Sequence, residues 1–221
     1  MLNTEINNLK KDLVMFATFV EDMISKSIKG LLNNQPDILH EVINEDEPKA
    51  NEYELEVEEK CTALIAQFQP LAKDLRTVLM IYKMNNDLER LGDQAVNISE
   101  SGLFLINKPP ISIANDDILK IKSEALRMLH DSITSFIEED TELSKTVCDR
   151  DSIVDDLRDS ILLKLTEYMK TDRSSIERCV SLIRIARNLE RVADLSTNIC
   201  EDVMYIVSGT VIKHRKDKEE D

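Results

Sequence analysis

Residues 88–100 read LERLGDQAVNISE, and residues 189–201, which lie 101 positions further on, read LERVADLSTNICE. Seven of the thirteen positions are identical, where unrelated segments would match at about one, so the chain contains an internal repeat. Each copy carries an acidic pair four residues apart, Glu89 with Asp93 and Glu190 with Asp194. Residues spaced by four lie on one face of a helix. The repeat therefore predicts two oxygen-rich stripes, which are candidate metal-binding surfaces.

The composition predicts an all-helical chain. Only 4 Gly and 5 Pro occur in 221 residues, while 42% of the residues are hydrophobic, so the turn residues of a β-rich protein are too few. Helical periodicity predicts three long segments in each half. The expected segments are residues 4–34, 37–69 and 71–106 in the first half, and residues 116–139, 142–169 and 174–207 in the second.

One linker divides the chain. Pro109 and Pro110 cannot continue a helix and favour extended backbone. We expect one three-helix unit over residues 1–108, a second over residues 112–210, and a charged, disordered tail over residues 211–221. The predicted fold is all-α, with two antiparallel three-helix bundles in tandem forming an elongated molecule.

The net charge of −15 argues against binding to nucleic acid or to anionic lipid, because both need clustered Lys and Arg. Cations, basic protein surfaces and hydrophobic grooves are the expected partners. The N-terminal segment has no apolar stretch of the kind found in signal peptides, and no apolar run is long enough to span a bilayer. The four Cys residues are scattered, as in a reducing compartment. A cytoplasmic protein is expected, one that meets a membrane only through protein partners.

The acidic stripes continue apolar ones. Traced backwards at 100° per residue, the face of each acidic pair carries hydrophobic side chains, which predicts that the carboxylates face other helices at the edge of the core. These apolar residues are Leu75, Leu79 and Tyr82 in the first copy, and Ile176, Val180 and Ile183 in the second.

A second set of pairs lies on the middle helices. Aligning the halves at an offset of 104 pairs Glu47 with Asp151 and Asn51 with Asp155. The middle and third helices of each half are antiparallel, and both acidic pairs lie about 20 residues from the connecting turn, or roughly 30 Å. The pairs should therefore meet side by side.

This geometry predicts one metal site in each half. Oxygen ligands without sulfur favour Mg, Mn, Ca or iron, with Zn less favoured, and several carboxylates could bridge more than one ion. Arg90 and Arg191 are a competing explanation, since each could neutralise a carboxylate without metal. The first site comprises Glu47, Asn51, Glu89, Asp93 and Asn97, and the second Asp151, Asp155, Glu190, Asp194 and Asn198.

These residues resemble the PhoU family of accessory regulators of phosphate uptake. The resemblance rests on the two Leu-Glu-Arg-x-x-Asp copies, on QPLAKDLR at residues 69–76, and on NICE at residues 198–201, and it covers nearly the whole chain. It implies two three-helix bundles, acidic clusters that hold multinuclear iron or other metals, and a non-enzymatic role. It also implies action with the ATPase-driven high-affinity phosphate ABC transporter and with a sensor histidine kinase, repressing the phosphate-starvation response, often as a homodimer.

Two departures and three alternatives accompany the resemblance. Pro48 and Asn51 make the first site the weaker expectation, so the second, with four carboxylates, is favoured. The alternative functions are an accessory protein of a low-affinity phosphate permease, a plain helical scaffold with solvated acidic faces, and a carboxylate-bridged hydrolase or oxidase. The last lacks an evident base, nucleophile or His ligand. The sequence also shows no basic anion pocket.

Overall fold

A computed structural model describes residues 1–210 of the chain; the charged tail expected at residues 211–221 lies outside them. In this range the protein is all-α, without strands, as predicted. The helices are α1 (Leu2–Leu32), α2 (Pro36–Glu41), α3 (Glu47–Phe68), α4 (Ala72–Ile106), α5 (Asn115–Glu138), α6 (Thr141–Thr171) and α7 (Ile176–Ser208), with a π-helical turn η1 (Val42–Asp46) before α3 and a 3₁₀ turn η2 (Arg173–Ser175) before α7.

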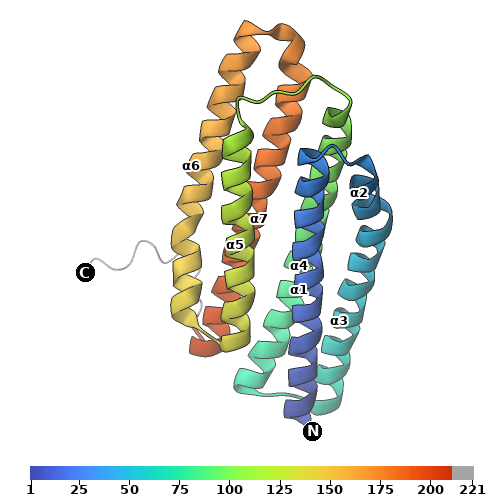
Figure 1. The fold of residues 1–221 in the computed structure, drawn as a ribbon. Helices are drawn as coiled ribbons and strands as arrows, with labels where there is room; N and C mark the ends of the chain where they lie inside the picture. The colour runs from blue at the N-terminus through green and yellow to red at the C-terminus, as the bar shows by residue number, and fades with distance from the viewer. Residues whose placement is uncertain (211–221) are drawn as a thin grey trace, which may run out of the picture.

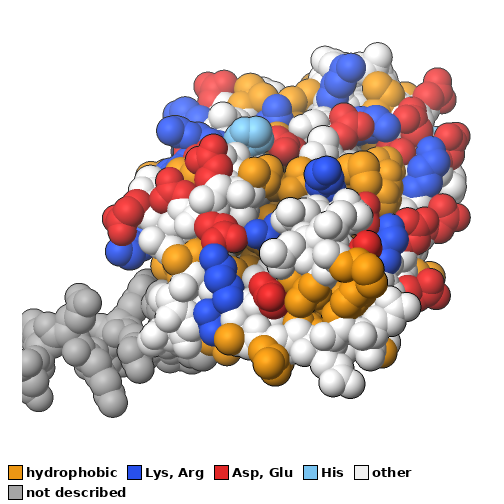
Figure 2. Space-filling view, turned by 90° about the horizontal axis from the view of Figure 1, so that it is seen from below, with side chains coloured by type: hydrophobic (Ala, Val, Ile, Leu, Met, Phe, Trp, Pro, Cys, Tyr) orange, Lys and Arg blue, Asp and Glu red, His pale blue; other side chains and the backbone are white. Residues whose placement is uncertain are grey.

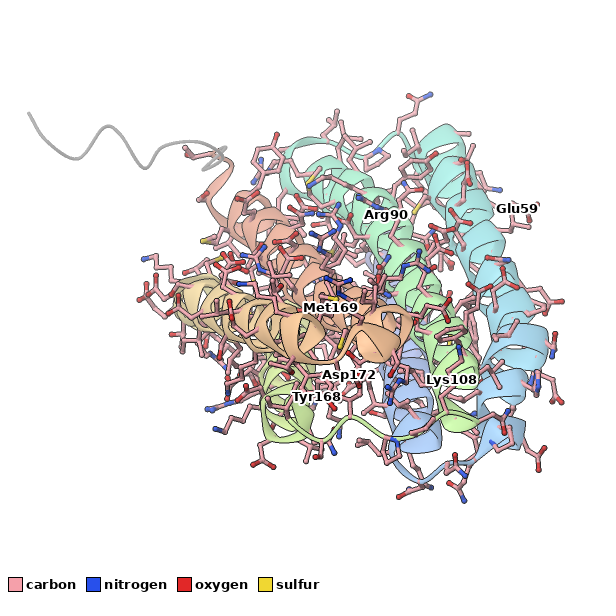
Figure 3. All side chains as sticks on the ribbon, turned by 90° about the horizontal axis from the view of Figure 1, so that it is seen from above. Glu59, Arg90, Lys108, Tyr168, Met169 and Asp172 are labelled. Carbon is pink, nitrogen blue, oxygen red and sulfur yellow. The ribbon has the colours of Figure 1, made fainter. Side chains whose placement is uncertain are left out.

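Two three-helix bundles lie side by side. Helices α1, α3 and α4 form one bundle, and α5, α6 and α7 form the other. The bundles lie alongside each other and not end to end, so the helices run along the long axis of the molecule (Figure 1). The bundles meet mainly where α4 packs against α7, with α1 against α5. Seen along the helices, α3 and α6 lie on opposite flanks with α4 and α7 between them (Figure 3). Buried side chains of both halves form one continuous core.

The helix ends follow from local chemistry. The Asp140 carboxylate accepts the backbone N–H groups of Glu142 and Leu143 at 2.9 and 3.0 Å, which caps the N-terminus of α6. Gly209 ends α7 in the left-handed conformation, with φ of 69°, as its lack of a Cβ permits. This stop agrees with the end expected from the sequence.

Pro48 lies in the first turn of α3, and the turn before it is π-helical. Proline has no N–H to donate to the carbonyl four residues earlier, so the helix cannot keep regular hydrogen bonding through this point. The widened turn buries Asp46, which is 3% exposed, and its carboxylate forms an ion pair with Lys26 at 3.0 Å. Glu47 follows directly, so this irregularity sets where the first acidic pair begins.

The apolar stripes traced from the sequence are not core. Leu79 and Tyr82 are 44% and 39% exposed, and Ile176 and Val180 are 44% and 39% exposed. The expectation that this face packs on other helices held only in part. Ile183 packs against the core and Tyr82 donates a hydrogen bond to Glu58 of α3, but the core is filled mainly by a second apolar face of α4 and of α7. On α4 that buried face includes Val78, Ile81, Met84 and Leu88. Periodicity tells which residues share a face, but not which of two apolar faces is covered.

Charges of both signs alternate with hydrophobic groups over the lower end of the molecule (Figure 2). No large basic field covers this face, in keeping with the net charge of −15. Among residues 1–210, no helix is long and apolar enough to cross a membrane.

Candidate metal centre

Helices α3 and α4 bring four carboxylates of the first half together, Glu47 and Glu54 from α3 with Glu89 and Asp93 from α4; we call them the first cluster. Each α4 carboxylate acts electrostatically on α3 carboxylates: Asp93 on both Glu47 and Glu54, and Glu89 on the same two. Of the α3 pair that the sequence predicted to meet Glu89 and Asp93, Glu47 acts electrostatically on both, whereas Asn51 is exposed. Glu54 was not among the predicted ligands.

The first cluster is electrostatically unfavourable without a cation. Desolvation and then the charges of Asp93 and Glu54 raise the pKa of Glu89. Desolvation and Glu47 raise the pKa of Asp93, while desolvation, Glu58 and Asp93 raise that of Glu54. Arg90 opposes the first two shifts without reversing them. Like charges held close disfavour one another's ionised form, so the cluster favours a proton or a metal ion.

An unsatisfied acceptor lies beside the first cluster. Asn85 is one helical turn before Glu89 on the same face of α4, and is 1% exposed. Its side-chain amide donates to the Glu54 carbonyl oxygen at 2.9 Å, whereas its Oδ1 atom is buried with no hydrogen-bond partner in the described residues. A buried acceptor without a partner is costly. The first cluster therefore offers one oxygen more than its carboxylates alone.

The second cluster contains a cation of its own. It comprises Asp155 and Arg158 from α6 with Glu190 and Asp194 from α7. The Arg158 guanidinium forms ion pairs with Asp155 at 3.0 Å and with Glu190 at 3.6 Å, and a third with Asp159 at 3.0 Å. The pKa of Glu190 is raised by desolvation and by Asp194, and Arg158 is the largest influence that lowers it. Arginine, with five donors in a fixed fork, satisfies several carboxylates at once.

The two clusters differ in charge because the residues at two equivalent positions of the repeat are not the same. At the offset of 104, Arg158 stands where the first half has Glu54, and at the offset of 101, Ala186 stands where it has Asn85. The second half thus gains a guanidinium and loses a carboxylate and an amide oxygen.

The predicted asparagines contribute less. Asn97 lines a separate cleft between α4 and α7, Asn51 is exposed on α3, and Asn198 is half-buried on α7. Asp151 is half-buried on α6, one turn before Asp155. The ion pairs and electrostatic contacts described above do not link any of these four residues to the carboxylates of either cluster.

The arginines weighed as alternatives to metal bind only nearby carboxylates on their own helices. Arg90 pairs with Asp87 at 3.4 Å, and Arg191 with Asp194 at 2.9 Å. Neither therefore bridges the two helices of its cluster as Arg158 does. The neutralising arginine comes from α6, not from the repeated motif.

The two clusters differ in their fit to a metal ion. Across residues 1–210, no three His, Cys, Asp or Glu side chains already converge on one point that could hold an ion. The donor set of the first cluster fits a hard cation, since it has four carboxylates and an unsatisfied amide oxygen. The second does not fit, because the Arg158 guanidinium lies among its carboxylates.

The sequence contained signals for the two residues that were missed. Glu54 follows Glu47 by seven residues and so continues the same helical face, and the alignment that paired Glu47 with Asp151 also pairs Glu54 with Arg158. Asn85 gave no comparable signal, since its burial and its contact with α3 depend on tertiary packing.

Comparison with known proteins agrees with the repeat and with the fold. A family described as "PhoU domain" matches residues 13–102 and again residues 118–203. The chain is 35% identical, over 97% of its length and 96% of the other's, to the phosphate-specific transport system accessory protein PhoU homolog of Aquifex aeolicus. It is 30% identical to Escherichia coli PhoU over 96% of this chain and 87% of that one.

A solved structure shares the architecture. The crystal structure of PhoU from Pseudomonas aeruginosa superposes with a TM-score of 0.91 at 28% identity, covering 95% of this chain and all of the other. The duplicated motif, the paired three-helix bundles and the two matches to the family model, which together cover most of the chain, lead to one conclusion: the chain belongs to the PhoU family.

Proposed function

We propose that this protein is a non-enzymatic accessory regulator of a phosphate-specific transport system. The observation that carries the proposal is the similarity over 97% of the chain to a protein named as an accessory protein of that system. The non-enzymatic part of the proposal rests on the names of the relatives, which call them accessory proteins.

The finer proposal concerns partners. The protein acts in the cytoplasm as an adaptor between the ATPase of a high-affinity phosphate ABC transporter and a sensor histidine kinase, as a homodimer, and restrains the phosphate-starvation response when phosphate is plentiful. The exposed apolar side chains of α4 and α7, among them Leu79 and Val180, offer surface for such contacts. Exposed apolar groups that recur on one face are typical of interaction sites.

We also propose that the first cluster binds metal. Glu47, Glu54, Glu89 and Asp93 would supply the carboxylates, and iron is favoured by the family resemblance, with Mn, Mg, Ca or Zn as alternatives. Desolvation first, and then mutual repulsion, raises the pKa values of three of these groups, and a bound cation would offset both effects. The carboxylates must turn inward to converge, since they do not share one point in the described structure.

Deletion of the gene tests the regulatory role. A reporter driven by phosphate starvation should become active in phosphate-rich medium and be silenced again when the wild-type gene is restored. The protein should also co-purify with the transporter ATPase and the kinase. A reporter that stays silent after deletion would contradict the proposal.

A second deletion separates the alternative. If the protein instead serves a low-affinity permease, removing the ABC transporter should leave its regulatory effect intact. If it serves the ABC transporter, the same removal should abolish that effect.

A further inference from the structure

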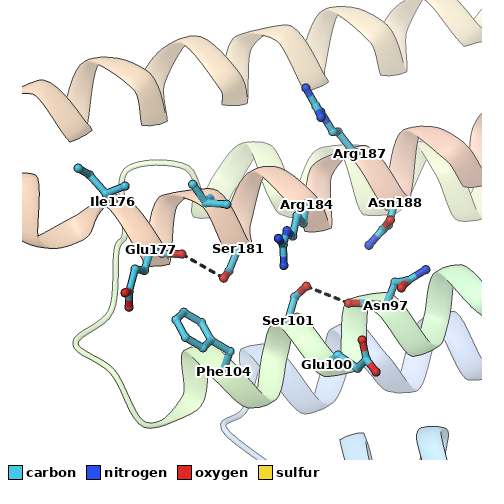
Figure 4. A pocket seen from close by; sticks show the side chains of 11 residues that line it. Asn97, Glu100, Ser101, Phe104, Ile176, Glu177, Ser181, Arg184, Arg187 and Asn188 are labelled. Carbon is cyan, nitrogen blue, oxygen red and sulfur yellow. Dashed lines mark hydrogen bonds between the residues drawn. The ribbon is translucent and has the colours of Figure 1, made fainter.

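A cleft of about 680 Å³ opens between the C-terminal half of α4 and the N-terminal half of α7 (Figure 4). Arg184 of α7 extends into it beside Ser101 of α4, while Asn97 and Asn188 face each other from the two helices. The cleft is separate from both acidic clusters. Its lining includes two arginines and two amide side chains, in a protein whose net charge is −15. Of the two arginines, Arg184 extends between α4 and α7, whereas the Arg187 side chain points away from α4 (Figure 4).

The internal repeat shows what is unusual about this cleft. Because α4 and α7 are antiparallel copies of one helix, each contact between them has a counterpart at the offset of 101. The counterpart of Arg184 with Ser101 is Lys83 with Asp202. Lys83 forms an ion pair with Asp202, whose carboxylate is buried at 4% exposure. At that end of the interface, the protein supplies the anion itself.

At the Arg184 end, the corresponding anions have been replaced. Ser101 stands in place of Asp202, and Asn188 in place of Asp87, a carboxylate that is 5% exposed in the other copy. The cation is retained, as arginine instead of lysine. Within residues 1–210, no carboxylate lies in ion-pair distance of the Arg184 guanidinium, and no hydrogen bond is formed by its side chain.

Two glutamates at the cleft need separate accounts. Glu177 forms an ion pair with Lys108 at 3.0 Å and is thereby neutralised. Glu100 lies on the α4 side and remains a negative charge at the cleft. It should weaken anion binding without blocking the position occupied by Asp202 in the other copy.

We propose that this cleft binds a phosphate-class oxyanion, free or as a small phosphomonoester, through the Arg184 guanidinium and the amides of Asn97 and Asn188. A planar guanidinium donates two parallel hydrogen bonds to a phosphoryl group. The short Ser101 side chain leaves space where an aspartate closes the other copy.

The opposite end of the cleft is apolar. Phe104, Ile176 and Val180 line it and are 39%, 44% and 39% exposed. An organic group attached to the phosphate could rest there, which is the reason for including phosphomonoesters. The sequence gave no sign of the pocket, because Arg184 and Ser101 are far apart in the chain and meet only through the packing of α4 on α7.

The test uses full-length protein stripped of metal with a chelator, so that phosphate cannot bind through a metal ion. Titration calorimetry with inorganic phosphate and with phenyl phosphate should give saturable 1:1 binding by at least one probe. Arg184→Gln should weaken it about tenfold or more, as expected for loss of a charge-assisted pair. Lys120→Gln removes one positive charge from an exposed position of α5, away from the cleft, and should leave the affinity within about twofold.

Ser101→Asp is the sharper variant, because it installs the internal carboxylate of the other copy. It should abolish binding while circular dichroism and the melting temperature show a folded protein, and Glu100→Gln should strengthen binding. Tighter binding of phenyl phosphate than of inorganic phosphate assigns the site to a phosphomonoester, and equal or weaker binding assigns it to free phosphate.

The proposal is overturned if neither probe binds, if Arg184→Gln and Lys120→Gln weaken binding equally, or if Ser101→Asp binds normally. Because metal-free protein is used, these failures leave the proposed metal cluster and the regulatory role untouched. Conversely, a protein that fails the reporter test could still bind the anion.

Discussion

The two halves of this protein hold their acidic helix pairs together by different means. In the second half, Arg158 from α6 reaches Asp155 and Glu190 at 3.0 and 3.6 Å. In the first half, Glu54 occupies the equivalent position and adds to the negative charge. One duplicated framework thus carries one cluster whose repulsion a bridging arginine partly offsets, although the pKa of Glu190 stays raised, and one cluster without such a bridge. A repeat conserves geometry more readily than it conserves electrostatics.

The bridging arginine also makes the second cluster less dependent on added cations than the first. An ion pair formed by the protein's own arginine is present whatever the solution contains. A cluster of four carboxylates is costly alone and is relieved only when a cation binds. We therefore expect the first half to respond to metal and the second to stay largely unchanged.

Removing ligands from one cluster at a time should give the largest effect. Glu89→Gln with Asp93→Asn should abolish metal retention in protein purified without chelator, as measured by elemental analysis. The matched pair Glu190→Gln with Asp194→Asn should leave metal content near the wild-type value, because Arg158 already neutralises that cluster. Equal loss in both variants would show that the halves bind metal alike, and no metal in the wild type would remove the proposed site altogether.

Exchanging the two distinguishing residues should move the site. Glu54→Arg should strongly reduce metal binding at the first cluster, since it introduces the guanidinium found in the second. Arg158→Glu should raise the metal content, by giving the second cluster a fourth carboxylate facing its neighbour helix. Titration calorimetry with Mn²⁺ checks both variants. A second cluster that stays without metal after Arg158→Glu would show that Asn85, absent from that half, is also required.

Arg158 should also matter for stability. Arg158→Met keeps most of the apolar stem but leaves Asp155 and Glu190 without their shared partner. The pairs are only partly buried, with Arg158 28% exposed, so their value is reduced by solvent screening. We expect the melting temperature to fall by about 2–4 °C, corresponding to roughly 1 kcal/mol. A scanning-calorimetry shift smaller than that of the surface control Lys120→Met would contradict the structural role.

The sequence predicted the architecture well and the site only in part. The Pro109-Pro110 pair marked the linker between the halves, and the 101-residue repeat marked the duplication, because these signals are local or periodic. It ranked the second site above the first by counting carboxylates within the repeated motifs. Our proposal favours the first cluster instead, on the positions of Arg158, Glu54 and Asn85, whose effect depends on which side chains face each other across helices.

The same limit explains the error about the apolar stripe. Leu79 and Val180 share a face with the acidic pairs as predicted, yet that face is partly exposed. The packing of α4 on α1 and α7 determines which of its two apolar faces is buried. The sequence of one helix alone does not contain this information.

The smallest expected effect is a pH dependence confined to metal-free protein. The pKa of Glu89 is raised above its ordinary value of 4.5, first by desolvation and then by Asp93 and Glu54. Between the ordinary and the raised value, the folded state binds more protons than the unfolded state, so the free energy of unfolding falls as pH rises through this window. Glu89→Gln should therefore raise the melting temperature at pH 7 by about 1–3 °C and give no gain at pH 4. Glu190→Gln should gain less at pH 7, because it also loses the attraction of Arg158. Equal gains for the two variants would mean that Arg158 does not offset the repulsion in its cluster, and the contrast between the halves would then rest on Glu54 and Asn85.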